Sequence, residues 1–164
     1  MRAKCAHDSE SVYEQVTCIM LPRFKHILVP LDLTAKNKAA LDIAFELAVE
    51  NKARVSLLHV TQAIEPVDQA PDAETVAFYN RVQQRVTTEL ETLAQRFEAA
   101  NLDVEVKVHL GQPLKDIVQF SETHNVDLIV MSSHPIDASD VINSWGTLSY
   151  KVSLACKCPI LLVK

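Results

Sequence analysis

The sequence is poor in glycine and in cysteine, and both shortages limit what the chain can be. It has two glycines among 164 residues, whereas average usage would supply about eleven. A loop that cradles phosphates with closely spaced glycines therefore has few residues to draw on. The four cysteines have no framework spacing, which excludes a disulfide scaffold and predicts reduced thiols in a cytoplasmic protein.

Cys156 and Cys158 are the most closely spaced cysteines, with one residue between them. Zinc sites usually leave about two to four residues between paired cysteines and take two further ligands from a second pair, which this chain lacks. We therefore interpret both as small apolar residues at a helix-to-strand junction rather than as metal ligands.

The chain also lacks an excess of basic charge and a long apolar run. Its net charge is −5 at pH 7, with acidic and basic residues interspersed, so the clustered cations that bind nucleic acid are missing. No stretch approaches the roughly 20 apolar residues of a membrane span, and residues 1–23 contain no signal-peptide core. We expect neither nucleic acid nor a membrane as a partner.

Residues 1–23 form a polar N-terminal extension without sustained hydrophobic periodicity. Met20 is an alternative start of the protein, and a short docking arm is another interpretation of this segment. Residues 24–164 are expected to form one domain, because a chain of this length buries roughly 70% of the surface of its unfolded form.

Two continuous apolar runs carry most of the information about the fold. The first, Ile27 to Leu31, ends on Asp32, and the second, Leu128 to Met131, ends on Ser132. Runs of this length between helical patterns are typical of interior strands in a parallel sheet covered by helices. Ligands of such sheets bind at the carboxyl ends of the strands, where the strand order reverses.

Helical and strand patterns alternate along the rest of the chain. Residues 40–48 and 82–97 show the spacing of helices with one buried face, and Thr34 or Asn37 is expected to cap the first of them. The predicted order is strand 27–31, helix 37–48, strand 55–60, loop 62–72, helix 74–100, strand 104–110, helix 113–124, strand 127–131, helix 145–155 and strand 159–163.

These elements predict a single doubly wound α/β domain. Right-handed crossovers with one reversal give a five-stranded parallel sheet of order 3-2-1-4-5 with helices on both faces. The strand from Val104 to Leu110 alternates apolar with polar residues, so it is expected at an edge. Because the reversal falls between the first and fourth strands, Asp32 and Ser132 become neighbours.

The last strand lies at the other edge of this sheet and is uniformly apolar until Lys164. An apolar edge without protecting charges invites pairing with another chain. We therefore expect a two-fold homodimer in which the last strands meet, through Ile160, Leu161, Leu162 and Val163.

Several ordered motifs resemble the universal stress protein family over residues 24–164. They are Lys25 to Thr34, Leu58-His59-Val60, Gly111-Gln112-Pro113, Asp127 to Met131, and Cys158 to Val163. The resemblance implies a cytoplasmic α/β dimer made under stress. One branch of this family binds ATP through a glycine fingerprint that follows the fourth strand, where backbone amides and a helix N-terminus meet the phosphates.

In this chain the fingerprint is damaged. Ser132 and Pro135 stand at two glycine positions, and Gly146-Thr147 matches the third only with one extra residue in the gap. Strain at a glycine-only position and the loss of a hydrogen bond to a charged group would together remove roughly 3–6 kcal/mol. A micromolar ligand is worth about 8 kcal/mol, so binding would become millimolar or vanish.

By this resemblance Pro30 and Asp32 border the nucleotide, Val60 meets the adenine, and Gly146 with Thr147 holds phosphate. The expected ligand is ATP or AMP, with Mg²⁺, in a weakened site. From the residues alone, Asp32 could instead cap the following helix, and His134 is expected to be the only histidine in the crevice. The full candidate set is Pro30, Leu31, Asp32, Val60, Met131, Ser132, Ser133, His134, Gly146, Thr147 and Leu148.

Three alternatives compete with this hypothesis. The chain resembles a branch of the family without the fingerprint, which would make it a nucleotide-free dimeric interaction protein. A slow ATPase or phosphotransferase ranks lower, because Asp32 could serve the metal but residues 132–147 contain no lysine or arginine. A phosphorylated receiver domain is rejected, because the strand at 104–110 does not end in an aspartate.

Overall fold

The computed structural model describes residues 23–62, 73–134 and 146–164. The N-terminal extension, the loop after residue 62, Pro135 and Trp145 lie outside this part of the chain. The elements are β1 (His26–Pro30), α1 (Asn37–Asn51), β2 (Arg54–Gln62), α2 (Ala73–Ala99), β3 (Val104–Gly111), α3 (Pro113–Thr123), β4 (Leu128–Ser132), α5 (Leu148–Ala155) and β5 (Ile160–Val163).

The strands form one five-stranded sheet in the order β3-β2-β1-β4-β5, and every pair of neighbours is parallel. This confirms the predicted fold class and strand order. β1 lies at the centre, where Ile27 pairs with Val55 of β2 on one side and with Leu128 of β4 on the other. β3 is half-buried along nearly its whole length, as expected of an edge strand.

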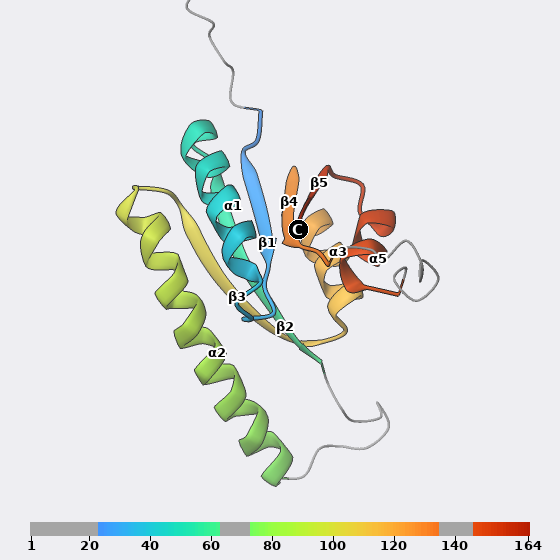
Figure 1. Ribbon diagram of the computed structural model, residues 1–164. Helices are drawn as coiled ribbons and strands as arrows, with labels where there is room; N and C mark the ends of the chain where they lie inside the picture. Colours follow the sequence, from blue (N-terminus) through green and yellow to red (C-terminus); the bar gives the residue numbers. More distant parts are fainter. Residues whose placement is uncertain (1–22, 63–72, 135–145) are drawn as a thin grey trace, which may run out of the picture.

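Helices cover both faces of the sheet (Figure 1), and alternate residues of β1 supply the two cores. Ile27 and Val29 belong to the core under α1 and α2, whereas Leu28 belongs to the core under α3 and α5. All three side chains are 0% exposed, which is why this segment reads as a continuous apolar run rather than an alternating one.

The start of α1 differs from the prediction that Thr34 or Asn37 caps it. Lys36 is the N-cap residue and makes no side-chain cap hydrogen bond, and Asn37 is already inside the helix. Thr34 instead donates its backbone N–H and its hydroxyl to Oδ1 of Asp32, at 3.0 and 2.7 Å. The alternative of Asp32 as the cap is also wrong, because its carboxylate closes this turn ahead of the helix.

Among the described helices, none combines the length and the hydropathy that crossing a membrane requires.

The core under α1 and α2 leads to a prediction about stability. Phe97 of α2 is 1% exposed and meets Phe45 edge-to-face, with ring centroids 5.5 Å apart. We expect Phe97→Ala to lower the free energy of unfolding by about 3–5 kcal/mol, because it removes a buried ring and leaves a cavity. Urea unfolding followed by circular dichroism measures this change.

The matched control is the same substitution on the same helix at Phe78, which is 48% exposed. Phe78→Ala should stay within about 0.5 kcal/mol of the wild type. Equal losses in the two variants would contradict the placement of the core on the Phe97 face of α2.

Candidate functional site

The candidate site is a cavity at the carboxyl ends of β1 and β4. These strands pair only at Ile27–Leu128 and Leu28–Ile129, although β1 continues to Pro30 and β4 to Ser132. Beyond those pairs a cavity of about 450 Å³ opens. Its lining residues are Pro30, Leu31, Asp32, Asn37, Leu58, His59, Val60, Gln62, Pro113, Ile117, Met131, Ser132, His134, Thr147, Leu148 and Ser149.

All of the expected site residues line this cavity except Ser133 and Gly146. The backbone N–H of Ser133 donates to the carbonyl of Val163 in β5 at 2.7 Å, so it continues the sheet rather than facing the crevice. The Ser133 hydroxyl lies 3.2 Å from that of Ser149. Gly146 is exposed and lies just before the start of α5.

Asp32 lies exposed at the tip of β1, and a strained backbone positions it. Leu33, the next residue, has a φ of 59°, which costs a non-glycine residue about 1–3 kcal/mol. The two bonds from Thr34 engage Oδ1 of Asp32. Within the described part of the chain Oδ2 has no hydrogen-bond partner, so one carboxylate oxygen remains available to a ligand hydroxyl or cation.

Asn37 connects the tips of the two strands. It is 4% exposed, and its Oδ1 accepts the backbone N–H of Asp32 at 3.1 Å. Its Nδ2 donates to the hydroxyl of Ser132 at 2.8 Å. One amide therefore spans the gap between β1 and β4 and brings Asp32 and Ser132 together, as the predicted topology requires.

The crevice contains two histidines rather than one. His134 lines the cavity as expected, but His59 of β2 lines it as well. The Nδ1–H of His59 donates to the carbonyl of Leu31 at 2.9 Å, which turns the ring toward the tip of β1. The prediction that His134 is the only histidine there is therefore wrong, because β2 runs beside β1 and ends at the same cavity.

Lys36 brings a cation to the edge of the site, and it was not among the predicted site residues. Its Nζ donates to Nε2 of His134 at 2.7 Å. The segment after β4 contains no lysine or arginine up to residue 147, so the charge comes from the N-cap position of α1. The only signal in the sequence was the position of Lys36, four residues after Asp32.

The walls of the cavity are largely apolar. Met131 belongs to the same hydrophobic core as Ile117 of α3, and the partly buried Val60 packs against that core. Pro113 at the start of α3 lines the cavity with them. Apolar walls with a few convergent polar groups are typical of small-molecule sites. This arrangement suits a flat apolar group against the walls and a hydroxyl or charged group near Asp32.

A second cavity, of about 570 Å³, lies between α1 and α2. Leu33, Leu41, Leu93 and Phe97 line it, together with charged residues at its rim. Arg96 at that rim is paired with Asp42, so its charge is already neutralised. The cavity at the strand tips is the better candidate because Oδ2 of Asp32 there has no partner among the described residues.

Cys156 and Cys158 belong to no metal-binding cluster of described residues. Across residues 23–62, 73–134 and 146–164 no group of three or more His, Cys, Asp or Glu could hold a metal ion. Burial raises the pKa of the Cys156 thiol, and burial together with the neighbouring Cys156 raises that of Cys158. Both thiols therefore stay protonated at neutral pH, whereas metal binding requires thiolates.

Comparisons of the sequence and of the fold with known proteins agree on one family. The family model of the universal stress protein family matches residues 23–164. Universal stress protein YxiE of Bacillus subtilis (strain 168) is 28% identical over 148 residues, which cover 86% of this chain and 99% of that protein.

Solved structures with the same fold include hypothetical protein MJ0577, with a TM-score of 0.72 and 24% identity over 86% of this chain and 96% of that one. A universal stress protein in complex with cAMP has a TM-score of 0.64 at 17% identity, covering 86% and 97% of the two chains. The universal stress protein from Archaeoglobus fulgidus in complex with dAMP has a TM-score of 0.59 at 18% identity, covering 86% and 98%.

The bridge made by Asn37 can be tested by a double-mutant cycle with Ser132. We expect Asn37→Ala to lower the free energy of unfolding by about 1–3 kcal/mol, because the backbone N–H of Asp32 and the hydroxyl of Ser132 both lose their bond to Asn37. The coupling energy between Asn37→Ala and Ser132→Ala should be about 0.5–1.5 kcal/mol, measured by urea unfolding of the four proteins.

Asn51→Ala is the matched control, since Asn51 bonds the backbone N–H groups of Arg23 and Phe24 at the other end of α1. Combined with Ser132→Ala it should be additive within about 0.5 kcal/mol. An Asn37–Ser132 coupling as small as this control would mean that the amide does not join the strand tips.

Proposed function

The chain belongs to the universal stress protein family, and on that premise we propose that it is a cytoplasmic, dimeric stress-response module with a weak adenine-nucleotide site. The observation that carries the nucleotide site is the cavity between the tips of β1 and β4, with Asp32 at its rim. The complexes of related structures with cAMP and dAMP support an adenine nucleotide as the ligand class.

The apolar walls would hold the base, and Asp32 would hold the sugar. An adenine ring would lie against Val60 and Met131, where its flat face replaces water. Oδ2 of Asp32 would accept a hydrogen bond from a ribose hydroxyl, a charge-assisted bond worth about 1.5–3 kcal/mol. The cavity of about 450 Å³ is within the range of small-molecule sites, roughly 300–1,000 Å³.

The phosphates of a nucleotide would find few hydrogen-bond donors among the described residues of this site. The N–H of Ser133 is already bonded to Val163, and Pro135 has no N–H to donate. The hydroxyl of Ser132 accepts from Asn37 and keeps its own hydrogen for a phosphate oxygen. Lys36 is the nearby cation, although it is bound to His134. We therefore propose that a monophosphate such as AMP is favoured over ATP.

Magnesium would depend on the nucleotide. Asp32 is the only acidic residue that lines the cavity in the described part of the chain, and Mg²⁺ is usually bound by one or two carboxylates together with substrate phosphates. A single carboxylate supports Mg²⁺ only when the phosphates of ATP supply further oxygens. Rapid phosphoryl transfer is not proposed, because the site presents no clamp of several cations.

Isothermal titration calorimetry of the purified protein tests the nucleotide site. We expect AMP to bind with a Kd of hundreds of micromolar to a few millimolar, and ATP more weakly. Asp32→Ala should weaken AMP binding about 10- to 150-fold, the equivalent of one lost charged hydrogen bond.

Asp42→Ala is the control, because Asp42 lines the other cavity and should leave AMP binding unchanged. Weakening by Asp42→Ala but not by Asp32→Ala would move the site to the space between α1 and α2. No heat with either nucleotide at several millimolar would remove the nucleotide proposal and leave the nucleotide-free interaction protein. Phosphate release from ATP that is lost in Asp32→Ala would favour the slow ATPase.

We also propose that two chains associate through β5 and the adjoining face of α5. β5 is an edge strand, and its Leu161 is 38% exposed. Leu154 of α5 is 71% exposed and Leu148 39%. A free strand edge beside exposed leucines is costly in water and invites pairing with a second copy.

Sedimentation velocity tests the dimer. We expect the wild type to sediment as a dimer at micromolar concentration, and Leu161→Lys with Leu154→Lys to shift it to the monomer, because charges would be buried without partners. Val49→Lys is the matched control, since Val49 is 42% exposed and lies on α1, outside the proposed interface. A monomeric wild type, or an unchanged dimer in the double variant, would contradict this interface.

A further inference from the structure

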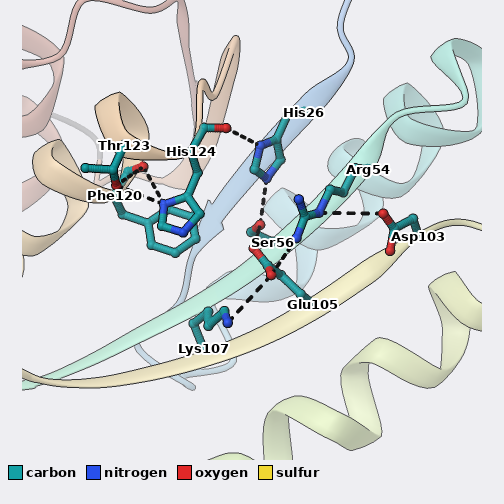
Figure 2. Close-up of polar contacts among 9 residues, drawn as sticks. All are labelled: His26, Arg54, Ser56, Asp103, Glu105, Lys107, Phe120, Thr123 and His124. Atoms are coloured by element: carbon teal, nitrogen blue, oxygen red, sulfur yellow. Dashed lines mark hydrogen bonds and ion pairs between the residues drawn. The ribbon is translucent and has the colours of Figure 1, made fainter.

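A continuous series of hydrogen bonds crosses the sheet at the amino ends of its strands, opposite the cavity (Figure 2). The backbone carbonyl of His124 lies 3.0 Å from Nδ1 of His26. Nε2 of the same ring lies 2.7 Å from Oγ of Ser56, and Ser56 donates to Oε1 of Glu105 at 2.8 Å. His26 is 6% exposed and Ser56 is 0% exposed, so water cannot replace these bonds.

The hydrogens needed for these bonds fix the protonation states of His26, Ser56 and Glu105. A carbonyl oxygen only accepts, so Nδ1 of His26 must carry a hydrogen. A serine hydroxyl has one hydrogen, and Ser56 gives it to Glu105. Nε2 of His26 must then donate to Ser56, because otherwise a ring lone pair would face a hydroxyl lone pair. All three bonds exist together only when both ring nitrogens are protonated.

We infer that the folded chain holds His26 as a buried imidazolium, the donor end of a His26–Ser56–Glu105 relay, and that this proton makes the joint between β1, β2, β3 and the end of α3 sensitive to pH.

The end of α3 favours a positive ring at this position. His124 is the C-cap residue of α3, so its carbonyl belongs to the negative end of the helix. Cations at helix C-termini are stabilised, most strongly in partly buried geometries. The side chain of His124 turns away from His26 and stacks on Phe120, with ring centroids 3.9 Å apart, as Figure 2 shows.

Glu105 supplies the matching negative charge. Burial raises the pKa of its carboxyl, but the hydrogen bond from Ser56 and the charges of Arg54 and Lys107 together bring that pKa below its usual value. Arg54 lies 2.6 Å and Lys107 3.7 Å from Oε2 of Glu105. Glu105 is therefore a carboxylate at neutral pH, which excludes the alternative in which a protonated Glu105 donates to Ser56 and leaves His26 neutral.

The charges from every element that packs around His26 balance when the ring is protonated. β2 supplies Arg54, and β3 supplies Glu105 and Lys107. Asp103, just before β3, lies 3.6 Å from Arg54, and Asp127, just before β4, accepts the backbone N–H of His26 at 3.2 Å. Arg54, Lys107, Glu105, Asp103 and Asp127 together carry one net negative charge, which the imidazolium cancels.

The effect on stability has a definite sign. An unfolded histidine loses its proton near pH 6.5, whereas the relay keeps it in the folded chain. Above about pH 6.5 the folded state therefore binds more protons than the unfolded state, so stability falls as the pH rises. Below that value both states carry the proton, and the contribution of His26 becomes constant.

Nuclear magnetic resonance of the histidine side chains in the full-length protein tests the proposal directly. In two-bond ¹H–¹⁵N spectra at about pH 7.5, where free histidine is mostly neutral, both ring nitrogens of His26 should show imidazolium shifts. A ring with a single protonated nitrogen at this pH would overturn the inference, and this outcome needs no variant.

Glu105→Gln is the variant that changes the hydrogen count with little change of shape. Its amide can donate to Ser56, so Ser56 can donate to a neutral His26 and every bond is kept. His26 should then be neutral at about pH 7.5. The wild-type Tm should fall by about 5–9 °C between pH 6.5 and 8.5, and this fall should be lost in Glu105→Gln.

Glu98→Gln is the matched control, since Glu98 lies exposed on α2 and should keep the wild-type pH profile. Identical titration of His26 in the wild type and in Glu105→Gln would refute the relay. A variant that fails to fold leaves the wild-type spectrum as the deciding measurement.

Discussion

The pairing of β1 with β4 is the contact on which the rest of the structure depends. It joins the half of the sheet formed by β1, β2 and β3 to the half formed by β4 and β5, through the pairs Ile27–Leu128 and Leu28–Ile129. Asp127 fixes this register, because its carboxylate accepts the backbone N–H groups of Lys25 and His26 at 2.8 and 3.2 Å. Since the strands separate after two pairs, the same contact also creates the crevice at their tips.

The architecture could be predicted because it follows from the pattern of apolar residues. Burial on both faces requires an unbroken apolar run such as Ile27 to Val29, and helices with one buried face require the spacing seen around Val86 and Leu90. These constraints act over short stretches, so they are visible in the sequence. The position of the crevice followed in turn from the strand order.

The polar contacts of the site could not be predicted in the same way. Thr34 and Asn37 have the residue types of helix caps, but their side chains bond Asp32 and Ser132 instead. A bond across the sheet depends on where a distant strand ends, which local propensity does not encode. His59 and Lys36 reach the site for the same reason, since each comes from an element other than β1 or β4.

Leu33 adopts a left-handed backbone between Asp32 and Thr34, and this single reversal sends neighbouring side chains into different compartments. Asp32 faces the hollow at the strand tips, whereas Leu33 lines the one between α1 and α2. Glycine or asparagine would adopt the same backbone at lower cost, but neither would fill the space that leucine occupies. Evolutionary drift at this position would therefore reshape both compartments in one step, even though no ligand need touch it.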